Sequence, residues 1–92
     1  MSELRQTVTI VNKRGLHARA SAKFVGAVAA LEHDATVRVA KGPNSAAGGS
    51  ILGLMMLGAA KGDSVDLIVE GDGAQAALDE LVALVEDGFG EE

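Results

Sequence analysis

The hydrophobic pattern of the chain changes its period several times, and each change marks a new element. Polar and apolar residues alternate over residues 7–10 and again over 35–39, which is typical of half-buried strands. Between these segments the apolar residues fall at helical spacing, which predicts an amphipathic helix over residues 18–31. Its inner face would carry Phe24, Val28 and Leu31. The first part of the chain is therefore expected to form a strand, a helix and a second strand.

Turn-forming residues divide the middle of the chain into short pieces. Because residues 42–45 have strong turn-forming character, any strand near 43–47 would be short. Ser50 is placed to cap a brief apolar helix that runs to Leu57, and Gly58 is placed to end it. We therefore expect a short strand and a short helix here.

The last third of the chain contains its clearest strand and its clearest helix. Residues 65–69 are mostly apolar, and the segment after them has the period of a helix that Asp72 would cap and Gly88 would end. The apolar stripe of that helix comprises Ala74, Ala77, Leu78, Leu81, Val82 and Val85. With short turns between the later strands, the order β-α-β-β-α-β-α predicts an α+β fold in which helices cover one face of a mostly antiparallel sheet. Residues 1–92 are expected to form this single domain.

Composition and charge exclude several classes of function. The 92 residues include 8 basic and 13 acidic side chains, a formal net charge of −5, which argues against a nucleic-acid partner. Aromatic residues make up only 2% of the chain, so base stacking is unsupported as well. The absence of cysteine excludes disulfides and thiolate chemistry. Since the apolar stretch at 46–60 is too short and too rich in glycine to span a membrane, we expect a cytoplasmic protein without membrane insertion. For so small and acidic a chain, a monomer is the default expectation.

The most informative residue is a histidine at the entrance of the first helix. His17 stands at or next to the N-cap, and the backbone amides of Ala18, Arg19 and Ala20 that follow it have no acceptor within the helix. The helix dipole adds partial positive charge at this end, which favours a bound anion. Four of the eight basic side chains lie in the same stretch, at Lys13, Arg14, Arg19 and Lys23. These features predict a site for an anionic group beside the imidazole.

Two interpretations of this arrangement stay open on the spacing alone. A neutral imidazole beside free amides and an arginine is suited to accept a phosphoryl group, because phosphoryl transfer depends mainly on positioning and charge stabilisation. Alternatively, His17 caps the helix and Arg19 is a solvated surface charge. The other histidine, His33, follows the presumed end of the first helix, where its ring would simply complement the helix dipole.

Other kinds of site are not favoured. Two histidines without carboxylates at ligand spacing do not indicate a metal site, and no cofactor is expected. The glycine-rich residues 46–50 lack the Gly-Lys-Ser/Thr ending of a nucleotide-binding P-loop. Nothing in the sequence supports a catalytic triad, so an independent enzyme is the weakest of the functional interpretations.

Two separated motifs resemble those of a known family. The run Gly-Leu-His-Ala-Arg at residues 15–19 resembles the active-site signature of HPr, the histidine-containing phosphocarrier of the bacterial phosphotransferase system. The apolar, glycine-flanked run at residues 49–58 and the Lys-Gly-Asp turn at 61–63 also fit, in the same order. The resemblance covers nearly the whole chain. It implies an open-faced β-sandwich, in which a four-stranded antiparallel sheet is covered on one side by three helices.

The resemblance also implies a function and its partners. His17 would accept a phosphoryl group on Nδ1 from the phosphohistidine of enzyme I, which phosphoenolpyruvate charges, and would pass it to a histidine of an enzyme IIA-type acceptor. Arg19 would stabilise the phosphate. Such a protein is a carrier without turnover of its own and without a metal. A proline usually follows the arginine in the family, whereas this chain has Ala20; because alanine adds an N–H and relaxes the backbone, we expect a modest change in the donor pocket.

A second expected site follows from the apolar residues after Ser50. The short helix has more apolar side chains than so small a core can hold, so part of it is expected to be exposed for docking of partners. The expected docking residues are Leu16, Ile51, Leu52, Leu54, Met55 and Met56. Ser50 itself resembles the serine that HPr kinase phosphorylates in some bacteria. This leaves an alternative function, a regulatory binding module of the same fold whose phosphorylation on His17 or Ser50 controls its partners.

Overall fold

The computed structural model describes residues 3–31 and 34–91, which form four strands, three α-helices and a short 3-10 turn. In chain order these are β1 (Glu3–Thr9), α1 (Ala18–Ala29), β2 (Thr36–Lys41), β3 (Asn44–Ala47), α2 (Ile51–Met56), β4 (Ser64–Glu70), α3 (Ala74–Glu86) and η1 (Gly88–Gly90). The order of strands and helices is the predicted one, with η1 as an addition. No helix in this part of the chain is long and apolar enough to cross a membrane.

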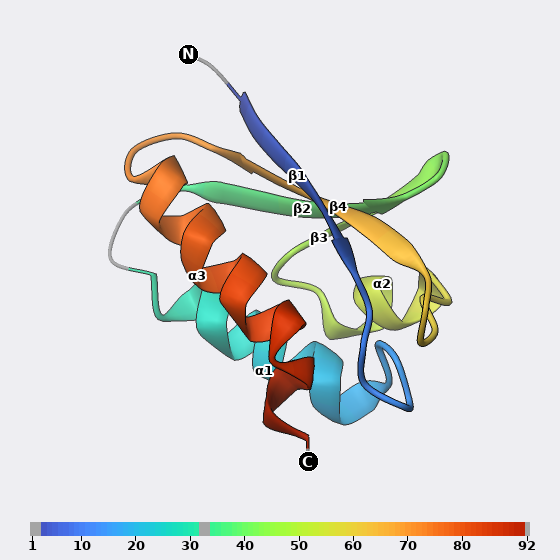
Figure 1. Cartoon of the computed structure of the whole chain (residues 1–92). Helices are drawn as coiled ribbons and strands as arrows, with labels where there is room; N and C mark the ends of the chain where they lie inside the picture. Colours follow the sequence, from blue (N-terminus) through green and yellow to red (C-terminus); the bar gives the residue numbers. More distant parts are fainter. Residues whose placement is uncertain (1–2, 32–33, 92) are drawn as a thin grey trace.

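The strands form one antiparallel sheet in the order β1-β4-β2-β3. Within it, Val65 of β4 lies opposite Val8 of β1, and Val69 of β4 lies opposite Val37 of β2. The strand β4 therefore joins the first strand to the hairpin of β2 and β3. Figure 1 shows the helices packed on one side of this sheet, while the other side is open. The predicted α+β fold, an open-faced β-sandwich, is confirmed.

The core lies between the sheet and the helices. α3 contributes its predicted stripe, all of which is buried: Ala74, Ala77, Leu78, Leu81, Val82 and Val85. From α1, Phe24 is fully buried, whereas Val28 and Leu31 pack only partly against the core. Phe89 of η1 is also fully buried, so the segment after α3 belongs to the core as well.

On the open face of the sheet, arginines flank an apolar residue of the central strand. Ile68 lies between Arg5 of β1 and Arg38 of β2 in the pairing register, and it is almost completely buried. The stems of long cationic side chains can cover apolar surface while their head groups stay in water. Asp66 accepts hydrogen bonds from Thr7 Oγ1 at 2.6 Å and from Arg5 Nη1 at 2.8 Å, and these bonds lower the pKa of its carboxyl group.

Several boundaries differ from the predicted ones. β1 begins at Glu3, before the alternating segment, because its polar residues pair with β4 along the whole strand. The predicted cap of α3 by Asp72 is wrong: the N-cap is Gly73, whose left-handed backbone (φ 71°) precedes the helix without a side-chain cap. α1 ends at Ala29, two residues earlier than expected. His33 lies outside the described residues, so its expected place at the helix end stays a prediction.

Candidate functional site

His17 is the N-cap of α1, as its position in the sequence predicted. Its backbone is extended (φ −78°, ψ −176°), and its ring nitrogen Nδ1 accepts a 3.3 Å hydrogen bond from the backbone N–H of Arg19. This bond satisfies one of the first-turn donors that have no partner within the helix. Nδ1 therefore faces the amino end of α1, where the helix dipole favours an anion.

The loop before His17 is fixed by close contacts with the segment after α2. Gly15 has a left-handed backbone (φ 62°), and a Cβ atom at this position would lie 2.3 Å from the carbonyl oxygen of Ala59. The backbone N–H of Leu16 donates to the same oxygen at 3.0 Å. The hydroxyl of Ser21 in turn donates to the Leu16 carbonyl oxygen at 3.2 Å. Only glycine permits so close an approach of the two segments. The two hydrogen bonds then hold the loop in place.

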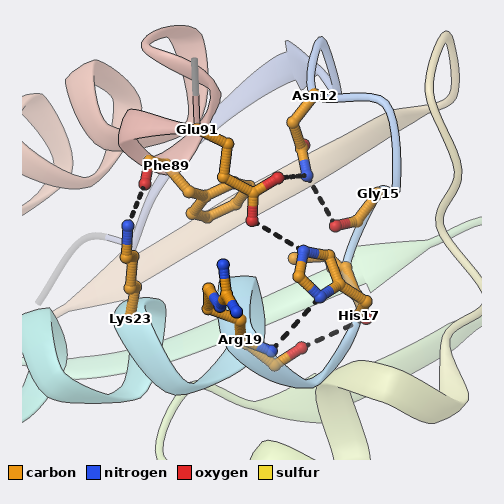
Figure 2. A network of polar contacts seen from close by, with 9 residues as sticks. Asn12, Gly15, His17, Arg19, Lys23, Phe89 and Glu91 are labelled. Carbon is orange, nitrogen blue, oxygen red and sulfur yellow. Dashed lines mark hydrogen bonds and ion pairs between the residues drawn. The ribbon is translucent and has the colours of Figure 1, made fainter.

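On its other side the imidazole contacts a residue that the sequence pattern did not indicate. His17 Nε2 lies 2.6 Å from Oε2 of Glu91, which is 74 residues away in the sequence (Figure 2). The two side chains are 17% and 18% exposed, so the pair is largely shielded from solvent. The hydrogen bond with His17 lowers the pKa of the Glu91 carboxyl group below its ordinary value of 4.5; burial opposes this shift, and a hydrogen bond from Asn12 supports it.

Residues 88–91, which we call the C-terminal tail, are held against the rest of the site by three further contacts (Figure 2). The ring of Phe89 is buried in the core although its backbone is left-handed (φ 59°), a conformation that is uncommon for bulky residues. Lys23 of α1 donates from Nζ to the Phe89 carbonyl oxygen at 2.8 Å. Asn12 Nδ2 donates to the Gly15 carbonyl oxygen at 2.8 Å and to Glu91 Oε1 at 3.2 Å. The loop, the helix and the tail thus meet at one imidazole.

The sequence contained only a weak signal for this tail. Phe89 is one of two aromatic residues in the chain, and it follows the glycine that ends α3, a pattern that could have indicated a buried anchor. Nothing in the sequence distinguishes Glu91 from the other acidic residues, of which the chain has 13 in total. Only the three-dimensional structure connects it with His17.

Basic side chains surround the imidazole and leave room for an anion. An open hollow beside the ring is lined by Arg14, His17, Arg19, Lys23, Gly90 and Glu91. Within residues 3–31 and 34–91, the Arg19 guanidinium makes no ion pair. Of the predicted backbone donors Ala18, Arg19 and Ala20, the Arg19 amide already donates to Nδ1. A phosphoryl group on Nδ1 would therefore replace Nδ1 as the acceptor of that amide and would lie beside the hollow that Arg19 lines.

The predicted docking residues divide into an exposed set and a buried set. Four residues of α2 are exposed and form what we call the α2 apolar surface: Ile51, Leu52, Met55 and Met56. The most exposed are Leu52 at 67% and Met56 at 77%. Leu54 is completely buried and Leu16 nearly so, and their assignment to a docking surface is wrong because both belong to the core. A helix that is apolar all round does not reveal from its sequence which side faces the core.

Ser50 caps α2, as predicted. Its Oγ accepts a 2.9 Å hydrogen bond from the backbone N–H of Gly53. The α2 apolar surface begins at the next residue, Ile51, so a charged group on the Ser50 hydroxyl would border that surface.

Comparison with known proteins decides the family. Residues 4–87 match the family model described as the PTS HPr component phosphorylation site. This chain belongs to the HPr family. Among HPr-family proteins it is similar to the phosphocarrier protein NPr of Shewanella violacea, with 44% identity over 91 residues that cover 99% of this chain and 98% of the relative. It is also similar to the phosphocarrier protein HPr of Pseudomonas aeruginosa, with 47% identity over 85 residues that cover 91% of this chain and 92% of the relative.

Solved HPr structures agree with the fold. The crystal structure of HPr from Thermoanaerobacter tengcongensis has a TM-score of 0.87 at 40% identity and covers 100% of this chain and 99% of its own. HPr from Bacillus anthracis has a TM-score of 0.84 at 29% identity, over 92% of this chain and 99% of its own. The resemblance drawn from residues 15–19 and 49–58 is confirmed. The relatives are named phosphocarrier proteins, and the family model describes the HPr component of the PTS.

Proposed function

We propose that this HPr-family chain accepts a phosphoryl group on Nδ1 of His17 and passes it to a partner protein. The observation that carries the proposal is the position of Nδ1 at the amino end of α1, against the backbone N–H of Arg19. Backbone donors and the helix dipole at such an end favour an anion. The names of the relatives, all phosphocarriers, support the same role.

In the accepting step, the lone pair of Nδ1 attacks the phosphorus of a donor phosphohistidine. The Nδ1–P bond forms as the donor's N–P bond breaks, and the donor ring takes back the electron pair. The hydrogen bond from Arg19 to Nδ1 is long, at 3.3 Å, so little is lost when the phosphoryl group displaces it. The amides of Ala18, Arg19 and Ala20 and the Arg19 guanidinium then stabilise the phosphoryl oxygens. The same step in reverse hands the group to an acceptor histidine.

The donor in this proposal is the phosphohistidine form of enzyme I, charged by phosphoenolpyruvate, and the acceptor is an enzyme IIA-type protein, all in the cytoplasm. The α2 apolar surface lies on a helix that packs against α1 and offers both partners one docking site. Methionine side chains adapt to more than one partner, which suits a carrier that must dock with two proteins in turn. The basic residues around His17 favour partners with acidic docking faces.

The alternative is a regulatory module that holds its phosphoryl group, or that is switched by a phosphate on Ser50. The cap of α2 already accounts for the Ser50 hydroxyl, so phosphorylation of this residue by HPr kinase stays a prediction. The complete site around His17 favours a carrier, because a module that is switched only at Ser50 does not need it.

Intact-protein mass spectrometry tests the proposal. The folded chain is incubated with phosphoenolpyruvate and a bacterial enzyme I, beside the variants His17→Ala and His33→Ala, of which the second removes the other histidine of the chain. We expect one acid-labile phosphoryl group on the wild type and on His33→Ala, and none on His17→Ala. An added IIA-type protein should then remove the group, whereas a regulatory module would keep it. A folded wild type that gains no phosphoryl group, or a His17→Ala variant that gains one, contradicts the proposal.

A further inference from the structure

The two contacts of the His17 ring select one tautomer of the neutral imidazole. A carboxylate only accepts hydrogen bonds, so Nε2 must carry a proton in its 2.6 Å contact with Glu91. The backbone N–H of Arg19 only donates, so Nδ1 must present its lone pair to it. A neutral imidazole has one donor and one acceptor nitrogen, and both neighbours therefore select the tautomer with the proton on Nε2. In that tautomer Nδ1 is already free of a proton and can act as a nucleophile.

The Glu91 carboxylate keeps its charge at neutral pH. The hydrogen bond with His17 lowers the pKa of this carboxyl group, and Asn12 and Lys23 contribute in the same direction. Arg14 and Arg19 line the hollow that the carboxylate borders. A charged acceptor makes the hydrogen bond to Nε2 shorter and stronger than a neutral acceptor would.

The fold holds this carboxylate in a defined place. Two residues before it, Phe89 is locked into the core, and Lys23 of α1 is bonded to the Phe89 carbonyl oxygen at 2.8 Å. The backbone N–H of Glu91 donates to the Gly88 carbonyl oxygen at 3.0 Å. An ion pair between loose surface side chains contributes little, because ordering the two groups opposes it. Here the packing of the tail has already ordered one partner and the cap of α1 the other.

Phosphoryl transfer gives the carboxylate a second task. When Nδ1 bonds to phosphorus while Nε2 keeps its proton, the ring becomes a phosphorylated imidazolium cation. A carboxylate 2.6 Å from Nε2 offsets that positive charge as it develops. When the group leaves, the acceptor nitrogen forms its own bond to phosphorus, and the electron pair of the broken Nδ1–P bond returns to Nδ1 as a lone pair. The proton remains on Nε2 throughout.

We propose that Glu91 is a positioning residue of the carrier: its carboxylate fixes the Nε2–H tautomer of His17 and stabilises the imidazolium that forms when Nδ1 is bonded to phosphorus. The second half of this assignment rests on the proposed function. The first half concerns the unphosphorylated chain and stands independently of any transfer.

Nitrogen-detected NMR of the His17 ring and steady-state phosphoryl transfer test the assignment together. The variant is Glu91→Gln, which keeps the size of the side chain but offers the ring either an oxygen or an NH₂ group. The matched control is Glu86→Gln, the same chemical change at an exposed position of α3. The long-range ¹H–¹⁵N spectrum gives the tautomer ratio, and urea unfolding confirms that each variant is folded.

We expect the Nε2–H tautomer of the wild type and of Glu86→Gln to be in about tenfold excess, and that excess to fall about fivefold or more in Glu91→Gln. The kcat for acceptance of a phosphoryl group from enzyme I should fall about tenfold in Glu91→Gln with KM unchanged, because the docking surface is intact. An unchanged tautomer ratio in folded Glu91→Gln overturns the assignment, and an unchanged kcat overturns its second half. A wild type that accepts no phosphoryl group defeats the proposed function instead, while the tautomer ratio still decides the contribution of Glu91.

Discussion

Replacing Gly15 by alanine tests how firmly the fold fixes the loop that carries the histidine. The added methyl group would lie 2.3 Å from the Ala59 carbonyl oxygen and 2.8 Å from the Ala60 Cα atom, so this segment has to retreat by about 1 Å. The left-handed backbone itself costs a non-glycine residue about 1–2 kcal/mol. Loss of the buried hydrogen bond from Leu16 to Ala59 costs about 1–3 kcal/mol more. We therefore expect Gly15→Ala to lower the free energy of unfolding by about 2–5 kcal/mol.

Gly42→Ala is the matched control for this substitution. Gly42 also has a left-handed backbone (φ 59°), but nothing lies within 4 Å of the Cβ position, so only the conformational cost applies. Because the chain has no tryptophan or tyrosine, unfolding in urea is followed by far-ultraviolet circular dichroism. Gly15→Ala should lose at least about 1 kcal/mol more than Gly42→Ala. Equal losses would refute the reasoning, since the close approach to Ala59 would then have no energetic consequence.

Substitutions in the sheet and in the α2 apolar surface test two other parts of the molecule. Hydrogen bonds from Thr7 and Arg5 lower the pKa of Asp66 below its ordinary value of 3.8. The stability that these bonds contribute is therefore fully present above pH 3.8, and it is lost as the pH falls through the lower pKa of the folded state. Asp66→Asn should flatten that loss in urea unfolding across the acid range, and an identical pH profile would contradict the expectation. Met56→Glu, at a position that is 77% exposed, should leave the free energy of unfolding within about 0.5 kcal/mol and raise the KM for enzyme I about fivefold or more. Leu54 is buried in the same helix, so Leu54→Ala should instead lower the free energy of unfolding by about 2–5 kcal/mol. A wild-type KM in Met56→Glu would show that the α2 apolar surface does not take part in docking.

The elements of the fold were predictable because apolar residues mark them by their spacing. The apolar stripe of α3 is buried throughout, because an amphipathic helix packs its apolar face against the core. The start of β1 was not predictable in this way, because hydrogen bonds with β4 rather than burial hold its polar residues. The cap of α3 was misplaced for a similar reason: Asp72 has the usual capping side chain, but the left-handed backbone of Gly73 comes between it and the helix.

Half of the candidate site was predictable because it is local. His17 and the Arg19 amide are two residues apart, and their geometry follows from the way a helix begins. Glu91 reaches the ring only through the packing of Phe89, which no spacing rule expresses. The assignment of Leu54 to the docking surface was wrong. The helical period places a side chain on one face of a helix but does not say which face packs against the core.

The central place of β4 determines when the site can exist during synthesis of the chain. A nascent chain that has emerged only to residue 63 can pair β2 with β3, and an isolated hairpin is barely stable in water. His17 leaves the ribosome early. The Ala59 carbonyl oxygen that accepts a hydrogen bond from Leu16 and the Glu91 carboxylate that contacts the His17 ring are synthesised later. An unfinished or truncated chain therefore carries the histidine without its surroundings. The surroundings of His17 are in this sense a property of the folded chain and not of its first segment.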